Sequence, residues 1–364
     1  MIHEGQLEVF DLTLTAKAPV FVGSGKSYVK KEYVFLTPRF ARVSCDEVML
    51  LDETKFFHLL LERKLEDKYT QFMLGAQTDL YRFLTAECCL SLNDIRAVSR
   101  YSIAAADALD AEHSLKEINA FVRGADGRVY VPGSSVKGAL RTAILTDWIL
   151  SDNSPHSAFG DTRKGFPEGA YLHTLKLKKD WNGTVLDDAV NSILRGLSIS
   201  DSLPVSDTCM ILAGKTDADS NGQTHRINLC RECIRPGTKL HFKLTLDQSV
   251  LHQKITAESL MRSVRTFDSF YESTYLRHFK APRHATEVSY DNTLFLGGGA
   301  GFFSKTLTYP YLGEKDGLQA AINRSFRKHR HEEDRADGIS PRTTKYALYE
   351  GELYPYGLCE VKIS

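Results

Sequence analysis

Segment 131–142, which reads VPGSSVKGALRT, constrains the fold of this chain more than any other part of it. An apolar stretch ends there in a Pro-Gly turn, and the residues after the turn are apolar at helical spacing. These apolar positions are Val136, Leu140, Ala143, Ile144 and Trp148. The segment therefore predicts a short strand at 129–131, a tight turn, and a helix with one face in the core.

The polar residues of this segment predict an anion site. Ser134 or Ser135 is expected to cap the helix, whose first N–H groups lack partners within it and whose dipole favours negative charge. Lys137 and Arg141 lie one turn apart, beside the apolar face. Together these residues predict a phosphate site, and the alternative is an ordinary capped helix with two solvated cations.

A first glycine-rich segment, GSGKS at residues 23–27, is not a nucleotide-binding P-loop. That motif requires a glycine five places before Gly25, where this chain has Val20, and no helical run follows. We expect a flexible loop in which free N–H groups and Lys26 contact an RNA backbone, with a plain turn as the alternative.

A second glycine-rich segment, GGGAG at residues 297–301, fails the dinucleotide-binding pattern because Phe302 stands at its last glycine. Without side chains, such a backbone approaches another backbone or an RNA strand closely, and Lys305 adds a charge just beyond it. Phe302 and Phe303 suit base stacking, although adjacent aromatic residues after a turn more often pack in the core.

Three motifs in this order, PGSSVKGALRT at 132–142, GGGAGFFSKT at 297–306 and ISPRTTK at 339–345, resemble those of the RAMP superfamily of CRISPR proteins. Segment 229–238 and the overall length further resemble the type III-A Csm subunit at the 3′ end of the CRISPR RNA. The resemblance runs from residue 7 to the C-terminus, which is nearly the whole chain.

This resemblance implies an α+β fold of two tandem ferredoxin-like modules, of the RNA-recognition type, with inserted helices and loops. We place the modules at residues 1–215 and 216–364. The implied function is that of a noncatalytic subunit of a type III-A CRISPR effector complex in antiviral defence. Such a subunit binds the CRISPR RNA (crRNA), caps its 3′ end, and supports 3′ maturation by recruited cellular ribonucleases.

The implied partners are the crRNA, the repeated backbone subunit and the other subunits of the complex, and we expect no cofactor and no metal. RNA contacts of this kind are largely independent of sequence, because a guide-carrying subunit must accept any spacer. The residues expected to make them are Gly23, Ser24, Gly25, Lys26, Ser134, Ser135, Lys137, Arg141, Gly297, Gly298, Gly299, Gly301 and Lys305.

The charge balance argues against a uniformly basic nucleic-acid binder. Lysine plus arginine and aspartate plus glutamate both number 46, so phosphate binding must come from local patches. We find no run of about 18 apolar residues and no signal peptide, which predicts a globular protein of the cytoplasm that does not bind membranes. Seven cysteines fit reduced thiols in that compartment.

Periodicity places the main elements. Apolar and polar residues alternate at 10–17 and again at 239–246, which predicts two half-buried strands. Apolar residues three or four apart predict helices at 52–73, 78–91 and 257–279. Segment 151–169 collects serine, aspartate, proline and glycine and is expected to be a loop.

The runner-up function is a CRISPR-RNA processing endoribonuclease of the same superfamily. Metal-free cleavage needs a positioned base and acid, but the twelve histidines form no recognisable cluster. Metal-dependent cleavage needs grouped carboxylates, and the available aspartates are typical of caps and turns: Asp187, Asp188, Asp201 and Asp207. In the related backbone subunit an aspartate after the first strand cleaves target RNA, whereas this chain reads KKEY at 30–33, and only Glu32 is available as a substitute.

Two further groups have structural interpretations that we favour. Cys230 and Cys233 have zinc-ligand spacing, but no second pair completes a site, so we expect buried thiols. Charged segment 323–345 is expected to be a solvated loop, although its first half also suits phosphates or a neighbouring subunit. Its cations are Arg324, Arg327, Lys328, Arg330, Arg335, Arg342 and Lys345.

Overall fold

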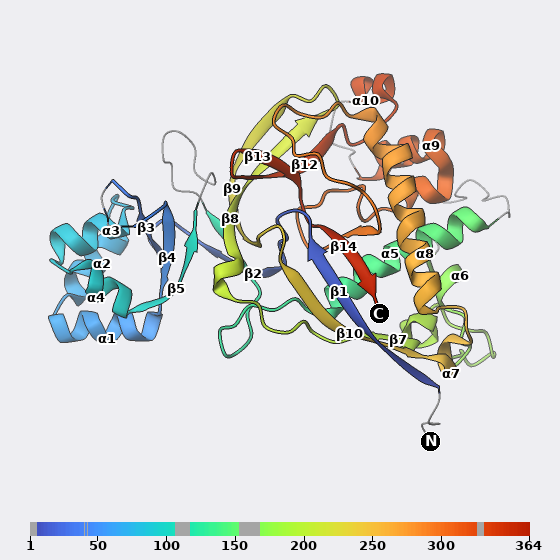
Figure 1. Cartoon of the computed structure of the whole chain (residues 1–364), viewed down its shortest axis with the longest axis horizontal. Coiled ribbons are helices and arrows are strands. Elements are labelled where there is room, and N and C mark those ends of the chain that lie inside the picture. Colours follow the sequence, from blue (N-terminus) through green and yellow to red (C-terminus); the bar gives the residue numbers. More distant parts are fainter. Residues whose placement is uncertain (1–5, 40, 42, 106–116, 153–167, 326–330) are drawn as a thin grey trace.

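The computed structural model describes residues 6–39, 41, 43–105, 117–152, 168–325 and 331–364. It contains two curled sheets with helices packed on them (Figure 1). The smaller sheet has, in spatial order, the strands β11 (Thr293–Phe295), β14 (Leu358–Ile363), β1 (Leu7–Ala16), β10 (Lys239–Asp247) and β7 (Leu197–Ile199).

The larger sheet begins at one edge with β2 and ends at the other with β3. Its strands, in spatial order, are β2 (Gly23–Tyr28), β6 (Ile118–Phe121), β9 (Thr224–Ile234), β8 (Met210–Asp219), β5 (Ser99–Ala104), β4 (Glu47–Leu51) and β3 (Tyr33–Leu36). Two more strands extend it, since β12 (Thr343–Tyr349) pairs with β8 and β13 (Glu352–Pro355) pairs with β12.

The helices fall into three groups along the chain. The first group is α1 (Glu53–Arg63), α2 (Glu66–Leu74), α3 (Leu80–Arg82) and α4 (Leu92–Ala97). The second is α5 (Gly133–Ser151) and α6 (Glu168–Leu172). The third is α7 (Gln248–Leu251), α8 (Ala257–Phe270), α9 (Thr308–Ala320) and α10 (Glu332–Asp337). Among the described residues, no helix has the length and apolar character needed to cross a membrane.

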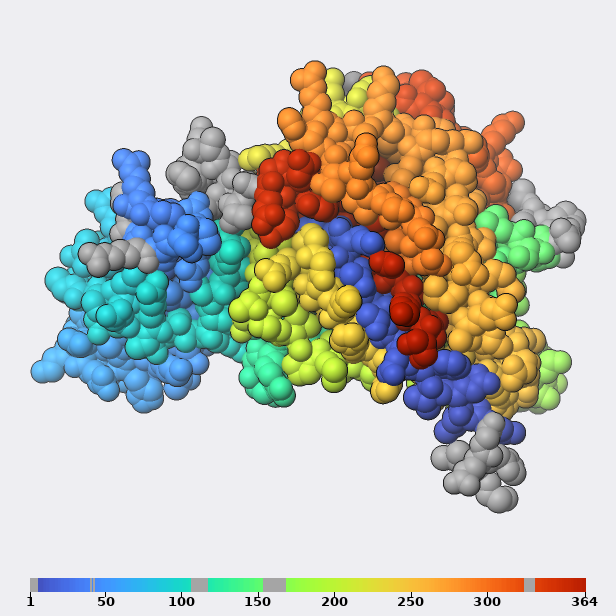
Figure 2. Space-filling model, viewed as in Figure 1, coloured from blue at the N-terminus to red at the C-terminus, as the bar shows by residue number. Residues whose placement is uncertain are grey.

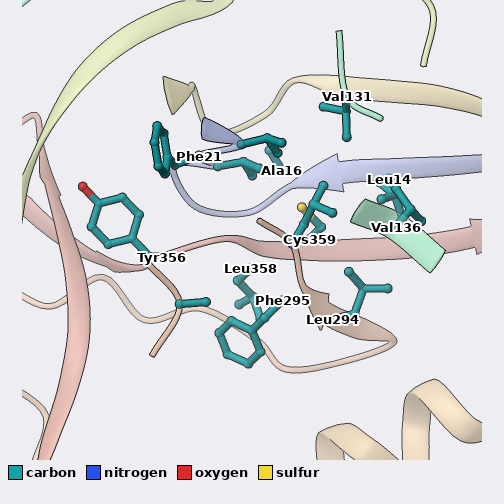
Figure 3. Packing of buried hydrophobic residues seen from close by; sticks show 14 of the residues in the cluster. Leu14, Ala16, Phe21, Val131, Val136, Leu294, Phe295, Tyr356, Leu358 and Cys359 are labelled. Carbon is teal, nitrogen blue, oxygen red and sulfur yellow. The ribbon is translucent and has the colours of Figure 1, made fainter. Parts of the chain in front are cut away.

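The two strands predicted from alternation are confirmed, and they pair with each other. β1 and β10 run antiparallel, with Leu12 opposite Phe242 and Leu14 opposite Leu240. The alternation buries these side chains on one face, where they meet α5 and β14 in the main core. Figure 3 shows that core, with Leu14, Val136, Leu294 and Cys359 drawn from four different elements.

The helices α1 to α4 and strands β3 to β5 form a lobe with its own core, which projects from one side of the molecule (Figure 2). The sequence predicts one helix over 52–73, but the structure has two. Lys64 adopts a left-handed conformation (φ 53°), and its N–H bonds the last carbonyls of α1, which ends the helix. The helix predicted at 78–91 is α3 followed by one turn of π-helix at Phe83–Glu87.

The helix predicted at 257–279 is confirmed. It begins at Thr256, whose hydroxyl oxygen accepts the N–H of Ser259 in a capping box, and α8 continues into turns of π- and 3₁₀-helix as far as His278. Asp147 of α5 fixes α8 across the core. It accepts hydrogen bonds from the hydroxyls of Ser263 and Thr266 at 2.9 and 3.0 Å.

The sheets do not follow the predicted module boundary. The point between residues 215 and 216 falls inside β8, and each sheet takes strands from both sides of it. The strand predicted at 129–131 is wrong, because only Val129 forms isolated bridges, to Arg123 and Val205. Most of the loop predicted at 151–169 lies outside the described residues.

Candidate nucleic-acid interface

A groove of about 390 Å³ brings together three of the predicted segments. Gly23 lies at the start of β2, Ser134, Ser135 and Arg141 lie on α5, and the third contribution comes from the segment after β11. That last segment supplies Gly297, Gly298 and Lys305. The three segments lie more than 100 positions apart in the sequence, so the fold assembles the groove.

The N-terminus of α5 differs from the prediction. Pro132 is the N-cap and has no side chain that can cap the helix, and Ser134 and Ser135 lie within the first turn. The N–H of Gly133 donates to the Asp201 carboxylate at 2.9 Å. The predicted serine cap is therefore wrong, and a carboxylate already meets the N-terminus of the helix. On this helix the groove is lined by the serine side chains and by Arg141, among others.

Lys137 and Arg141 lie on the same side of α5, but their side chains make different contacts. The Lys137 ammonium donates to the carbonyl oxygens of Leu194 and Leu197 at 2.8 and 2.7 Å, and Lys137 does not line the groove. Burial lowers the pKa of Lys137. Arg141 lines the groove and forms an ion pair with Glu168. Lys137 therefore ties α5 to the segment 194–197, whereas Arg141 lies at the surface of the groove.

Lys305 is the second cation of the groove. Its side chain makes no hydrogen bond or ion pair with any residue that the structure describes, and burial lowers the pKa of its ammonium. Lys305 is nevertheless exposed, and an unpaired cation at the wall of a groove binds an anion without first giving up another partner. Lys305 and Arg141 therefore make the groove suited to a phosphate backbone.

The glycine-rich segment approaches another backbone closely, as predicted. Gly297 has a positive φ (78°) and bridges to Phe21, where an added Cβ would lie 2.1 Å from the Phe21 carbonyl oxygen. The N–H of Gly298 donates to that same oxygen at 2.7 Å. Phe303 is buried and its ring stacks on Tyr275 with 4.5 Å between centroids, so the core interpretation holds for Phe303.

Gly299 and Gly301 do not line the groove, and they lie against two cations of the larger sheet. A Cβ on Gly299 would lie 2.9 Å from Arg231 Nη1, and one on Gly301 would lie 3.2 Å from Lys345 Cγ. Arg231 packs between two aromatic rings, and its Nε and Nη1 are buried without a hydrogen-bond partner. Sequence reasoning missed Arg231. The available signal was a charged pair, Arg231 and Glu232, between Cys230 and Cys233 in the buried half of β9.

The segment predicted as a flexible loop is a strand. Ser24, Gly25 and Lys26 belong to β2, which pairs with β6 through an irregular register. Gly25 has a positive φ (82°), and the Ser24 hydroxyl donates to the Ala120 carbonyl at 3.2 Å. These three residues are exposed but do not line the groove.

The carboxylates considered for nuclease chemistry have structural partners. Asp188 accepts the N–H of Val190, Asp207 pairs with Arg123, and Glu32 accepts the N–H of Val29 at 2.7 Å. The described residues hold no group of three or more histidines, cysteines and carboxylates that suits a metal ion. Cys230 and Cys233 lie in the main core.

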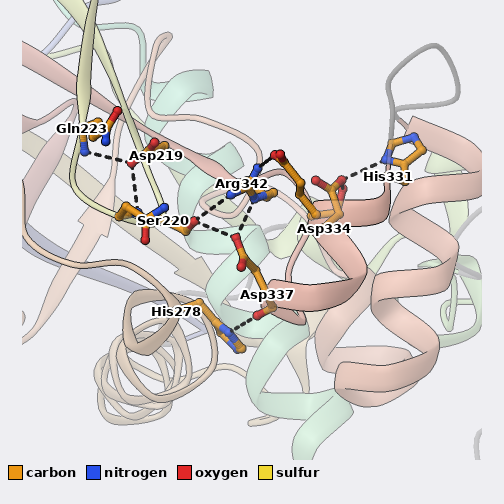
Figure 4. Close-up of polar contacts among 11 residues, drawn as sticks. Asp219, Ser220, Gln223, His278, His331, Asp334, Asp337 and Arg342 are labelled. Carbon is orange, nitrogen blue, oxygen red and sulfur yellow. Dashed lines mark hydrogen bonds and ion pairs between the residues drawn. The ribbon is translucent and has the colours of Figure 1, made fainter.

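The charged C-terminal segment forms an ion-pair network rather than a solvated loop (Figure 4). Arg342 donates to Asp337 at 2.6 Å and also contacts Ser220 and Glu333. Lys345 donates to Asp217 at 2.5 Å. The hydrogen bonds of Arg342 to Asp337, with nearby carboxylates, raise the pKa of its guanidinium. Residues 326–330, and the side chain of Arg324, lie outside the described part of the chain.

Comparison with known proteins shows the family of the chain. A model described as the RAMP superfamily matches residues 13–361. The chain is 28% identical to the CRISPR system Cms protein Csm5 of Streptococcus thermophilus, over 82% of this chain and 80% of that protein. It is 26% identical to the protein of the same name from Mycobacterium tuberculosis, over 98% of both chains.

Solved structures agree on the fold. A chain in the cryo-EM structure of a Csm-crRNA-target RNA ternary complex of a type III-A CRISPR-Cas system superimposes with a TM-score of 0.66 at 18% identity, covering 97% of this chain and 100% of that one. The crystal structure of T. onnurineus Csm5 gives 0.61 at 15% identity, covering 96% and 99%. The predicted fold class, with two tandem ferredoxin-like modules and inserted helices, is confirmed. Since the family model spans nearly all of the sequence, the chain belongs to the RAMP superfamily.

Proposed function

We propose that this chain is a noncatalytic subunit of a type III-A Csm effector complex and holds the 3′ end of the crRNA. The observation that carries the proposal is the groove that gathers Gly23, Arg141, Gly297 and Lys305 from distant parts of the chain. Its donors are cations, hydroxyls and backbone, which recognise phosphate and sugar without reading base sequence. The Csm5 names of the relatives support the same assignment.

In this proposal the partners are the crRNA, the repeated backbone subunit and the other subunits, in the cytoplasm. The chain influences 3′ maturation by shielding the RNA end that it holds, and recruited cellular ribonucleases trim what remains. The structural partners of Asp188, Asp207 and Glu32 support a noncatalytic role.

The test is the salt dependence of RNA binding by the full chain. An Arg141→Met, Lys305→Met double variant removes both cations of the groove. Each lost contact to single-stranded RNA lowers the slope of log K against log salt by about 0.7, so we expect the slope to flatten by about 1.4. The control is Lys362→Met, an exposed cation of β14 that lines no part of the groove. An unchanged slope in the double variant would sink the proposal.

The endoribonuclease alternative is tested with precursor RNA. Purified protein incubated with a repeat-spacer RNA, with and without chelator, is expected to leave the RNA intact. Discrete products cut within the repeat, and lost in a Glu32→Gln variant, would instead establish an enzyme. Sequencing the RNA that copurifies with the tagged chain is expected to give one repeat-derived 5′ end and variable 3′ ends.

A further inference from the structure

We propose that a second pocket, between β2 and the helical lobe, holds a nucleobase of the single-stranded RNA whose backbone lies in the groove. The inference rests on the proposed RNA-binding function and deepens it. Ligand pockets for small planar groups are mostly apolar, with a few polar groups at the rim that fix orientation. This pocket, of about 450 Å³, has aromatic and aliphatic walls of that kind, but it carries more charged and polar groups than such pockets usually do.

Aromatic rings from three elements line the pocket. They are Tyr28 of β2, Phe56 and Phe57 of α1, and Tyr69 of α2. Phe57 is 55% exposed, although its neighbour Phe56 is buried in the core of the lobe. The Phe57 ring stands nearly perpendicular to that of Tyr69 (89°), with 6.2 Å between centroids. An exposed ring at a pocket wall offers a stacking surface to any base, because every base has a π-face.

Charged side chains surround these rings. Lys26 and Arg100 are exposed, and neither is hydrogen-bonded or ion-paired within the described residues. Glu32 and Glu53 stand on the same rim, and carboxylates accept hydrogen bonds from the exocyclic amino groups of bases. Lys31 is not available, since its ammonium donates to the carbonyls of Phe72, Met73 and Gly75. The rim therefore offers two free cations to phosphates and two acceptors to a base.

β2 connects this pocket to the groove. Its first residue, Gly23, lines the groove, and its last three, Lys26, Ser27 and Tyr28, line the pocket. Six residues of strand span about 20 Å. β2 is an edge strand, paired only with β6, and it is exposed from Gly23 to Ser27. We infer that a single RNA strand leaves the groove along this exposed edge and reaches the pocket over the length of β2.

Met73, which lines the pocket, and the neighbouring Leu61 and Leu74 are exposed apolar side chains that suit a protein partner. The free cations on the rim favour RNA, because an apolar protein partner would bury Lys26 and Arg100 without compensation. Docking of another subunit is therefore an outcome that the experiment must detect.

The experiment compares Phe57→Ala with Leu61→Ala. Both residues are exposed on α1, one turn apart, but only Phe57 lines the pocket, so Leu61→Ala controls for loss of apolar surface. Binding of the full chain is measured with single-stranded RNA of mixed sequence and with an oligomer of the same length in which every sugar is abasic. Loss of one stacked base is expected to weaken binding of the normal RNA by about tenfold in Phe57→Ala.

The inference requires that Leu61→Ala bind as the unchanged chain does, and that the abasic oligomer not distinguish Phe57→Ala from the unchanged chain. Equal RNA affinities for Phe57→Ala and the unchanged chain would overturn it. A second result would also overturn it: Phe57→Ala and Leu61→Ala both bind RNA normally but associate more weakly with the other subunits of the complex. That result would show that the pocket binds a protein. The Arg141→Met, Lys305→Met variant separates the two proposals, because an unchanged salt slope in that variant contradicts the proposed function, whereas the Phe57→Ala result bears on the pocket alone.

Discussion

Lys137 and Lys305 have the same charge and were both expected at the RNA, but their surroundings differ. The Lys137 ammonium satisfies two carbonyls in the tightly packed 194–197 segment, whereas Lys305 has no partner among the described residues. A buried acceptor that loses its donor costs about 1–3 kcal/mol. We therefore expect Lys137 to contribute to the stability of the fold and Lys305 to contribute to RNA binding.

We predict that Lys137→Met lowers the free energy of unfolding by about 2 kcal/mol and leaves RNA affinity unchanged. Lys305→Met is expected to do the reverse, weakening RNA binding without measurable loss of stability. Denaturant unfolding and RNA titration of both variants check this. A Lys137→Met protein of normal stability that binds RNA poorly would return Lys137 to the RNA contacts.

Asp268 predicts a pH dependence. Its carboxylate on α8 accepts the N–H and hydroxyl of Thr293 at 2.6 and 2.5 Å, and burial raises its pKa to about 6. The folded state therefore holds the proton more tightly than the unfolded chain. The stability contributed by this group is complete below its unfolded pKa of 3.8 and is lost as the pH rises through about 6.

The measurement is the melting temperature of the unchanged chain minus that of Asp268→Asn, between pH 5 and 7.5. We expect this difference to fall as the pH rises, because only the unchanged chain has to ionise a buried carboxyl. A difference that rises with pH would mean that the hydrogen bonds from Thr293 outweigh burial.

At the scale of elements, the loop after β11 depends on a close backbone contact. Gly297 combines a positive φ with a Cβ position 2.1 Å from the Phe21 carbonyl oxygen, whereas Gly127 has a similar φ and no atom within 4 Å of its Cβ position. Comparing alanine substitutions at Gly297 and Gly127 therefore distinguishes the cost of the backbone conformation from the cost of the steric clash. The clash also bears on function, since Phe21 leads directly into β2 and the groove.

We predict that Gly297→Ala costs about 3 kcal/mol of folding free energy or more, and that Gly127→Ala costs about 1 kcal/mol. Gly297→Ala is also expected to weaken RNA binding, because the loop has to move from Phe21. If Gly297→Ala and Gly127→Ala lower the free energy of unfolding equally, the positive φ alone explains the cost. The contact between Gly297 and Phe21 would then adjust to a Cβ without a measurable penalty.

At the scale of the whole molecule, two separate cores predict two units of stability. Leu84 is fully buried in the core of the helical lobe, and Leu244 is fully buried in the main core. The lobe joins the rest through the larger sheet, where β5 meets β8 at one residue pair, Ala104 and Ile211. The other face of β3 to β5 contributes Tyr33, Leu50 and Ile103 to the main core, so local opening is expected on the side of these strands that faces α1 to α4.

We predict that Leu84→Ala, at a cost of about 3 kcal/mol, raises amide hydrogen exchange across residues 34–98 and leaves β1, β10 and β14 protected. Leu244→Ala is expected to raise exchange in both units. Mass spectrometry of exchanged peptides measures this. Uniformly faster exchange in Leu84→Ala would show that the chain unfolds as one unit.

The sequence by itself determined what depends on neighbours along the chain. Alternation identified β1 and β10, helical spacing identified α8, and the glycines at 297 and 298 indicated a close backbone approach, since these signals are local. Only the tertiary structure decided which of the neighbouring cations faces the groove. Spacing places Lys137 and Arg141 together on a helix, but the carbonyls of 194–197 and the carboxylate of Glu168, brought from elsewhere in the chain, give each its role. The edge strand β2 and the buried Arg231 escaped sequence reasoning for the same reason, because pairing with β6 and stacking on Tyr356 are long-range contacts.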